Sequence, residues 1–234
     1  MYPVAVLAGG VGSRIAPIND SDLPKVLLPV AGRPFIDYKL TTLAAAGVDR
    51  VVLLVGHRSE LVERHVGTGS RYSLSVTYAF DGPQLLGTGG ALRRALTQLG
   101  EIFWVTYGDT LLTVPMKEVE ESYRASGLRA LMTVLHNRDR WDRSNVAVAD
   151  GMVVEYRKGS ALGTFEHIDY GMSILPIAAF EAFPPDRAFD LEEVLSGLVA
   201  ARELAAFEVQ ERFYEIGTPE SYAETVAFFS TTMR

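Results

Sequence analysis

Residues 4–14 read VAVLAGGVGSR, a short apolar run followed directly by a glycine-rich loop. The continuous run from Val4 to Leu7 predicts a strand that is covered on both faces. Three glycines in positions 9–12 would let backbone N–H groups approach a phosphate closely, and Arg14 would add a positive charge beside them. The stretch therefore predicts a buried strand that leads into either a phosphate-binding loop or a tight turn before a helix.

Two well-known phosphate-binding loops do not match this stretch. A P-loop needs a lysine and then a serine or threonine after its last glycine, but here Arg14 is followed by Ile15. The dinucleotide fingerprint needs a small residue three places after Gly12, and Ile15 stands there. The loop therefore supports neither an ordinary ATPase nor a hydride-transfer enzyme.

Strand-like and helical patterns alternate up to about Asn137. Apolar runs predict strands at 4–7, 51–55, 74–80, 102–107 and 131–135, and helical spacing predicts helices at 34–46, 60–66, 90–99 and 116–125. Such alternation predicts an α/β fold with a doubly wound, mixed but mostly parallel central sheet.

The pattern changes in the second half of the chain. Runs at 146–148 and 152–156 flank Asp150-Gly151, which predicts a hairpin. Further strands are expected at 171–175 and 205–210, and helices at 178–183, 191–202 and 219–229, the last capped by Thr218. With no internal repeat or clear linker, we expect one domain over residues 1–234, with an antiparallel insertion roughly within 137–175.

Composition limits the class of protein. The chain has 234 residues, no cysteine and a formal net charge of −7. Disulfides and thiolate metal sites are excluded, and a cytoplasmic location is expected. A general nucleic-acid binder should carry a basic field, and no apolar run is long enough to span a bilayer. We therefore expect neither nucleic acid nor a membrane as a partner.

A lysine interrupts the apolar segment LPKVLLPV at residues 23–30. Lys25 would be costly to bury unless its amine meets an anion, and a surface position is the alternative. Residues 8–14, Pro24-Lys25 and Gly32-Arg33-Pro34 together resemble the pattern of sugar-1-phosphate nucleotidylyltransferases, in look closest to heptose-1-phosphate guanylyltransferases. The resemblance implies a Rossmann-like nucleotide-binding domain with an inserted sugar-binding region. It also implies that Arg14 and the glycine loop hold a triphosphate and that Lys25 contacts phosphate near the reacting centre.

Residues 86–92, LGTGGAL, resemble the segment of this family that lines the base pocket, and the small residues would permit close approach of a base or ribose. The alternative is a helix start capped by Thr88. Asp81 and Gln84 lie just upstream, where the family often reads the base. A carboxylate suits guanine and an amide suits uracil or thymine, so the base stays open. The expected nucleotide-binding residues are Leu7, Ala8, Gly9, Gly10, Gly12, Ser13, Asp81, Gln84, Gly87, Thr88 and Gly108.

Two carboxylates are candidate ligands of Mg²⁺. Asp109 ends the apolar run 102–107, and ligands of open α/β sheets gather at the carboxyl ends of strands. Glu215 opens EIGTPE, which resembles a late family motif whose first acid is the second metal ligand, here one methylene longer. We expect Arg14, Lys25 and Asp109 to be catalytic, and Asp109 with Glu215 to hold the metal.

The sugar side is expected to involve four residues of the second half. By resemblance, Asn145, Lys158, Asp169 and Gly171 match positions that contact the sugar. The polar stretch 138–145 around Trp141 is by itself typical of a solvated loop, and a wall of the sugar side is the alternative that its position offers.

The resemblance implies a Mg²⁺-dependent attack of a sugar 1-phosphate on the α-phosphorus of a nucleoside triphosphate, giving a nucleotide sugar and pyrophosphate. A heptose or mannose 1-phosphate and GTP are the expected substrates, and a uridylyl- or thymidylyltransferase of another sugar is the alternative. Molybdopterin guanylyltransferases, methylerythritol cytidylyltransferases and a non-catalytic nucleotide-sugar-binding relative are further alternatives. A homo-oligomer is left open.

Overall fold

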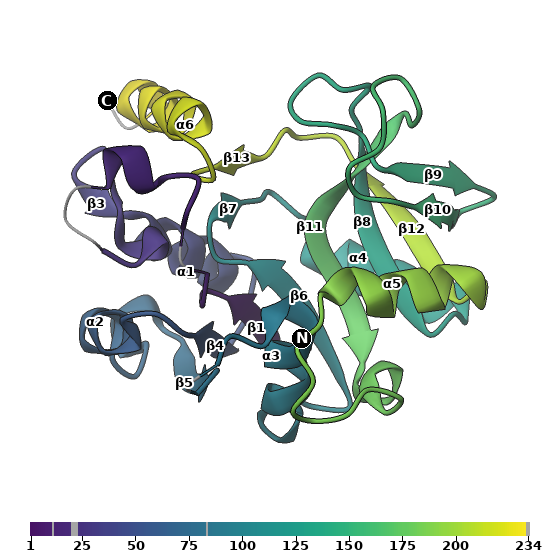
Figure 1. Ribbon diagram of the computed structural model, residues 1–234, viewed down its shortest axis with the longest axis horizontal. Coiled ribbons are helices and arrows are strands. Elements are labelled where there is room, and N and C mark those ends of the chain that lie inside the picture. The colour runs from purple at the N-terminus through teal and green to yellow at the C-terminus, as the bar shows by residue number, and fades with distance from the viewer. Residues whose placement is uncertain (11, 20–22, 83, 233–234) are drawn as a thin grey trace.

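The computed structural model describes residues 1–10, 12–19, 23–82 and 84–232. These residues form a nine-stranded sheet in the order β5-β4-β1-β6-β11-β8-β12-β10-β9 (Figure 1). The pairings make seven of these nine strands run in one direction, whereas β10 and β11 run in the other. The predicted mixed, mostly parallel α/β sheet is confirmed. The strands are β1 (Val4–Leu7), β4 (Arg50–Val55), β5 (Ser75–Phe80), β6 (Ile102–Tyr107), β8 (Ala130–His136), β9 (Val146–Ala149), β10 (Met152–Tyr156), β11 (His167–Pro176) and β12 (Leu204–Val209).

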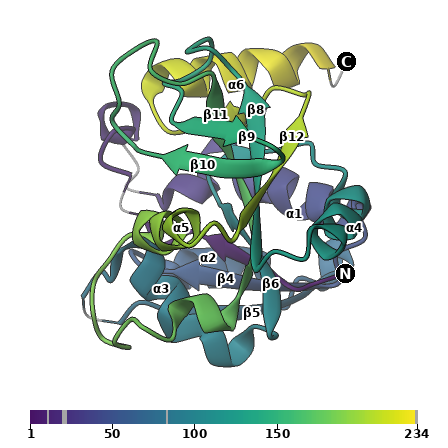
Figure 2. The same cartoon turned by 90° about the vertical axis from the view of Figure 1, so that its right-hand side faces the viewer.

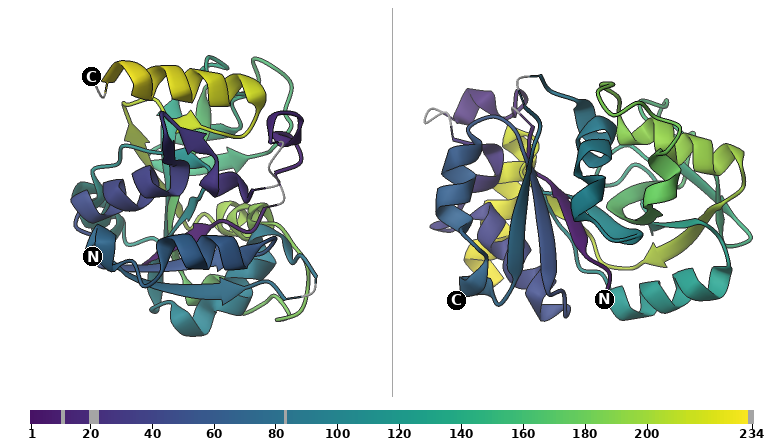
Figure 3. Two further views of the ribbon diagram at one scale, coloured as in Figure 1. Left: turned by 90° about the vertical axis from the view of Figure 1, so that its left-hand side faces the viewer. Right: turned by 90° about the horizontal axis from the view of Figure 1, so that it is seen from below.

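Helices cover both faces of the sheet, because successive side chains of a strand point to opposite faces. Val6 packs with side chains of α1, α2 and α4, whereas its neighbour Ala5 packs with side chains of α3 and α5. The right-hand view of Figure 3 shows α3 and α5 across the strands from α1 and α2. The helices are α1 (Phe35–Ala45), α2 (Ser59–Val66), α3 (Gly87–Ala95), α4 (Met116–Ser126), α5 (Leu191–Ala200) and α6 (Pro219–Thr232).

The carboxyl ends of three neighbouring parallel strands lie level with one another. Leu7, the last residue of β1, pairs with Leu54 of β4 on one side and with Tyr107 of β6 on the other. The glycine loop after β1 and the turn after β6 therefore leave the sheet at the same edge. This is the edge at which open α/β sheets bind ligands.

The second half adds the predicted hairpin. Asp150 and Gly151 both have positive φ, +50° and +73°, as a two-residue turn with matching twist requires. Figure 2 shows β9 and β10 at the far end of the sheet, with α5 beside them. Two short antiparallel pairs complete the fold, β2 (Pro29–Val30) with β3 (Arg33–Pro34) and β7 (Thr110–Leu111) with β13 (Tyr214–Glu215).

Two predicted helices differ in the structure. The expected helix at 178–183 is a 3-10 turn at Ile177–Phe180, because Pro184 disfavours helical backbone at the residue before it. The expected helix at 90–99 starts earlier, at Gly87, and passes into a 3-10 turn at Leu96–Gln98.

The last helix packs against the N-terminal part of the chain. Thr218 caps α6 as predicted, because its Oγ1 accepts a hydrogen bond from the Ser221 N–H at 3.2 Å. Phe229 of α6 packs in one cluster with Ile15, Leu28 and Phe35. A search of the described residues finds no helix with the length and apolar character needed to cross a membrane.

Candidate active site

A first pocket of about 250 Å³ lies at the carboxyl edge of the sheet. Most of the predicted nucleotide-binding residues line it, together with the two expected catalytic residues Lys25 and Asp109. The predicted residues in this lining are Leu7, Ala8, Gly9, Gly10, Gly12, Asp81, Gly87 and Thr88. The glycine loop and the start of α3 therefore face each other across one cavity, although they are far apart in the sequence.

Three predicted nucleotide-binding residues do not line either of the two large pockets. Ser13 and Gln84 are exposed. Gly108 lies beneath the loop, where its N–H donates to the Leu7 carbonyl at 2.9 Å. A Cβ there would stand 3.0 Å from both the Leu7 carbonyl oxygen and a Val26 methyl. Gly108 thus lets β6 end close to β1, so its predicted part in binding is indirect.

The glycine run at the start of α3 packs against a distant segment. The N–H groups of Gly89 and Gly90 both donate to the Phe189 carbonyl, at 2.9 and 3.1 Å. Thr88 does not cap α3, because its Oγ1 instead accepts from the N–H of Leu191, the first residue of α5, at 2.8 Å. The run therefore joins α3 to α5, and Asp190 beside it reaches the lining of the first pocket.

Lys25 and Asp109 form an ion pair on the wall of the first pocket. The Nζ of Lys25 lies 2.5 Å from Oδ2 of Asp109, and the side chains are 12% and 25% exposed. Pro24 and the buried Val26 and Leu27 hold the backbone at Lys25 in the core. The lysine in the apolar segment does meet an anion, as its position predicts.

Glu215 is held next to the Asp109 turn by the short pair of β7 and β13. Glu215 pairs with Thr110, and the N–H of Ile216 donates to the Asp109 carbonyl at 3.0 Å. Burial raises the pKa of Glu215, and the negative charges of Asp109 and Asp142 raise it further. Two carboxylates that repel each other in this way attract a cation. The described parts of the chain contain no group of three or more His, Cys, Asp or Glu arranged for a metal ion.

A second pocket, of about 470 Å³, adjoins the first. Tyr107 and Asp109 line both pockets, so Asp109 lies where the two meet. The predicted sugar-side residues Asn145, Lys158, Asp169 and Gly171 all line the second pocket. Arg14 and Glu215 line it as well. Arg14 therefore shares a cavity with Asp109, but it faces the second pocket rather than the first.

Backbone and side-chain hydrogen bonds fix the polar floor of the second pocket. The Asp169 N–H donates to Asn145 Oδ1 at 2.8 Å, and the Tyr156 hydroxyl donates to Asp169 Oδ2 at 3.2 Å. The Gly171 N–H donates to Asp169 Oδ1 at 2.9 Å. Burial raises the pKa of Asp169, while the Gly171 N–H and the charge of Lys158 oppose this rise. These contacts fix the position of the Asp169 carboxylate in the lining of the second pocket.

The polar stretch 138–145 is mostly exposed, as expected of a solvated loop, but its Trp141 contacts two guanidinium groups. The guanidinium carbon of Arg140 lies 4.5 Å from the centre of the Trp141 ring, and that of Arg212 lies 3.8 Å from it. Arg212 also lies over the Tyr214 ring at 4.4 Å and pairs with Glu224 of α6 at 2.9 Å. The loop carrying Asp142, Arg143 and Asn145 is thereby tied to the C-terminal segment.

Comparison with known proteins identifies the family. The family model described as "Nucleotidyl transferase" matches residues 4–144, more than half of the chain. The chain belongs to the nucleotidyl transferase family. The matched range contains the glycine loop, Lys25 and Asp109.

Similar proteins include guanylyltransferases of sugar 1-phosphates. The chain is 28% identical to the D-glycero-alpha-D-manno-heptose 1-phosphate guanylyltransferase of Aneurinibacillus thermoaerophilus, over 93% of the chain and 94% of that protein. It is 24% identical to the mannose-1-phosphate guanyltransferase of Schizosaccharomyces pombe, over 98% of the chain but 64% of that longer protein. The crystal structure of HddC from Yersinia pseudotuberculosis complexed with GMP-PN superposes with a TM-score of 0.82 at 27% identity, over 98% of the chain and all (100%) of HddC. The predicted enzyme class, sugar-1-phosphate nucleotidylyltransferase, is confirmed.

Several residues of this nucleotidyl transferase site were not predicted from the sequence. Tyr107 and Asp190 line the pockets, and Arg212 supports them from outside. Asp142 and Arg143, from the stretch for which a wall of the sugar side was the alternative, line the second pocket. Tyr107 carried a usable signal, because it ends a predicted strand at the ligand-binding edge. The others lie in loops whose position depends on contacts between distant segments.

Proposed function

We propose that this chain transfers a guanylyl group from GTP to a heptose or mannose 1-phosphate, giving a GDP-sugar and pyrophosphate. The observation that carries the proposal is that Asp109, paired with Lys25, lies where a glycine-lined pocket meets a second polar pocket. A phosphate oxygen of the sugar substrate forms a bond to the α-phosphorus of GTP. The bond from the α-phosphorus to the oxygen that bridges it to the β-phosphorus breaks, and pyrophosphate leaves. The attacking oxygen is already an anion, so the residues supply position and charge rather than a general base.

The carboxylate pair fits a hard divalent cation such as Mg²⁺. Asp109 and Glu215 would hold the ion with oxygen ligands, and phosphate oxygens and water would complete the shell. Both residues line the second pocket, and the backbone that follows Glu215 is hydrogen-bonded to that of Asp109, which supports a cation between the carboxylates. When bound, the ion would neutralise charge on the reacting phosphates.

The positive side chains divide between the two pockets. Lys25 would bind phosphate oxygens at the boundary, releasing part of its contact with Asp109 to the nucleotide. Arg14 would contact the phosphates from the second pocket, and Lys158 would hold the phosphate or a hydroxyl of the sugar. Lys25 is already held at the boundary by its ion pair with Asp109, which favours charge stabilisation with little reorganisation.

Guanine is the base that the lining supports best. Asp81 lines the first pocket, and its carboxylate would accept hydrogen bonds from guanine N1–H and N2–H₂. Gln84, whose amide would suit uracil or thymine, is exposed and lies outside this lining. The names of the relatives agree with guanine.

A substrate matrix tests the proposal. Four nucleoside triphosphates are combined with heptose, mannose and glucose 1-phosphates in the presence of Mg²⁺, and pyrophosphate release is measured. We expect release with GTP and a heptose or mannose 1-phosphate. Release only with UTP or dTTP would contradict the base assignment. Nucleotide-sugar binding without release from any pair would instead indicate a non-catalytic relative.

Three broader expectations stay predictions. The chain is expected to act as one domain over residues 1–234, with the sugar-side insertion at 137–175. A cytoplasmic location is expected for a cysteine-free enzyme of nucleotide chemistry. A homo-oligomer is compatible with the proposed function but no observation favours it.

A further inference from the structure

Lys39 is a buried cation that the proposed reaction does not use. It lies on α1 among hydrophobic residues and is only 2% exposed. Its Nζ donates to Thr106 Oγ1 at 2.8 Å and to the Thr110 carbonyl at 2.8 Å. Neither partner is a carboxylate, so these neutral acceptors do not balance the charge of the ammonium. Burying such a group costs free energy that a hydrocarbon side chain would not.

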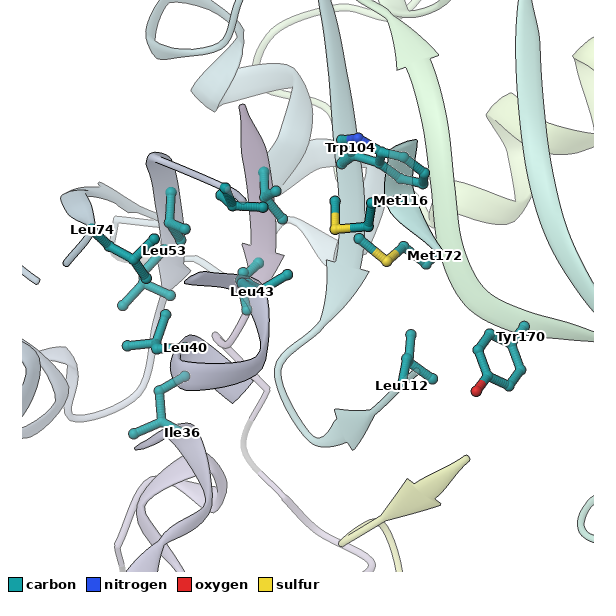
Figure 4. Packing of buried hydrophobic residues seen from close by; sticks show 14 of the residues in the cluster. Ile36, Leu40, Leu43, Leu53, Leu74, Trp104, Leu112, Met116, Tyr170 and Met172 are labelled. Atoms are coloured by element: carbon teal, nitrogen blue, oxygen red, sulfur yellow. The ribbon is translucent and has the colours of Figure 1, made fainter. Parts of the chain in front are cut away.

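The surroundings of Lys39 would accept a hydrocarbon. A cavity of about 20 Å³ beside it is lined by Leu43, Leu112, Met116 and Met172. Figure 4 shows these four apolar side chains in the buried cluster between α1 and β11. Packing alone therefore favours a leucine or methionine at position 39.

The two acceptors of Lys39 lie on either side of Asp109. Thr106 is in β6, three residues before it, and Thr110 begins β7 directly after it. Thr110 is also the residue that pairs with Glu215 across β7 and β13. One ammonium group thus bonds to residues on both sides of Asp109, and through Thr110 it contacts the strand pair that carries Glu215. Asp109 is also the group whose negative charge raises the pKa of Lys39 against the larger effect of burial.

We propose that Lys39 is a positioning residue, which holds the carboxylates of Asp109 and Glu215 in place through its hydrogen bonds to Thr106 and Thr110. This inference rests on the proposed function, because it assigns the carboxylates to one cation. The ammonium does not touch the substrates. It acts on the turn beneath them, as residues behind a metal ligand commonly do.

The test uses Lys39→Met and Thr106→Val in the full chain. Thr133→Val is the matched control, because Thr133 is an equally buried strand threonine whose hydroxyl donates to the Met172 carbonyl at 2.6 Å. Three quantities are measured: kcat and KM for GTP, binding of Mn²⁺ alone by electron paramagnetic resonance, and the free energy of unfolding. Thr106→Val keeps the charge of Lys39 and removes one of its acceptors. It therefore tests whether these hydrogen bonds position the carboxylates, even if Lys39→Met fails to fold.

We expect both test variants to weaken Mn²⁺ binding and lower kcat by about tenfold, with KM for GTP unchanged. The free energy of unfolding of Lys39→Met should be no lower than that of the wild type, because the substitution removes a buried charge. A merely structural lysine would give the opposite result, with lower stability and normal Mn²⁺ binding. Normal or tighter Mn²⁺ binding in Lys39→Met would overturn the proposal. It would mean that losing the repulsion between the Lys39 ammonium and the cation matters more than losing the hydrogen bonds of Lys39. If the wild type binds Mn²⁺ but transfers no nucleotide, the proposed function is overturned. If the wild type transfers nucleotide and the two variants have the same kcat and Mn²⁺ binding as the wild type, only the role of Lys39 is overturned.

Discussion

At the scale of single residues, the ion pair of Lys25 and Asp109 is the centre of the proposed chemistry. Each charge neutralises the other across 2.5 Å and each would be redirected to substrate or metal on binding. A pair of this kind is easily disrupted from either side, because removal of one member leaves the other charge partly buried and uncompensated.

We expect Lys25→Ala and Asp109→Asn each to lower turnover by about 10²-fold, because each removes a charged contact with the reacting phosphates. Pyrophosphate release under saturating substrates measures the effect. Lys117→Ala is the matched control, since Lys117 is an exposed lysine on α4. Near-normal turnover of both test variants would show that the assignment is wrong.

Lys39 also predicts a dependence of stability on pH. Burial lowers its pKa from 10.5 to about 7, so the unfolded chain binds this proton more tightly than the folded chain between these values. The free energy of unfolding should therefore rise as pH increases from about 7 to 10.5. The stability gained in this window is lost again as pH falls through 7. Lys39→Met lacks the effect, so its stability relative to the wild type should be higher at pH 6 than at pH 9. Denaturant unfolding at both pH values measures this, and a pH-independent difference would contradict it.

At the scale of elements, the start of α3 is the joint between the first pocket and α5. A Cβ at Gly89 would stand 2.4 Å from the ring of Phe189, which is itself buried and stacked on Phe183. The glycine run is therefore required by packing between α3 and the 187–190 segment, and not only by a bound base. This explains how small residues at one helix end place Thr88 and Asp190 on the same wall.

We expect Gly89→Ala to lower the free energy of unfolding by about 1 to 3 kcal/mol, because the methyl group overpacks this joint. Gly197→Ala is the matched control, since Gly197 is a helical glycine of α5 whose added Cβ would meet nothing within 4 Å. The control should instead stabilise the chain by about 0.5 to 1 kcal/mol. Equal effects of the two substitutions would contradict the packing argument.

At the scale of the whole molecule, the stack around Arg212 joins parts of the chain that are far apart in sequence. Trp141 belongs to the loop beside the second pocket, Tyr214 lies in β13 with Glu215, and Glu224 lies on α6. In Figure 1 the chain runs from β12 through β13 to α6. The proposed sugar-binding side and the proposed metal-binding side of the site thus share one support.

We expect Trp141→Ala and Arg212→Ala each to raise KM for the sugar 1-phosphate, with little change in KM for GTP. A double-mutant cycle on the free energy of unfolding should give a coupling of about 0.5 to 1 kcal/mol for their cation–π contact. Additive effects, with no coupling, would show that the stacked geometry does not contribute.

Much of the fold was determined by the sequence itself. Continuous apolar runs specified the strands of the first half, Asp150-Gly151 specified a hairpin turn, and Thr218 specified the start of α6. These features were readable because periodicity, turn chemistry and capping act between residues that are close in the chain. The glycine loop, Lys25 and Asp109 were readable for the same reason, since each follows a recognisable strand or interrupts an apolar segment.

Only the tertiary structure decided how these pieces meet. It placed Asp109 between the two pockets, Arg14 on the second of them, and Gln84 outside both. It also gave Lys39 its acceptors, turned the glycine run toward Phe189 rather than toward a ligand alone, and seated Trp141 against Arg212. These contacts join residues that are far apart in the chain, and local sequence patterns carry no information on which distant surfaces will pack together.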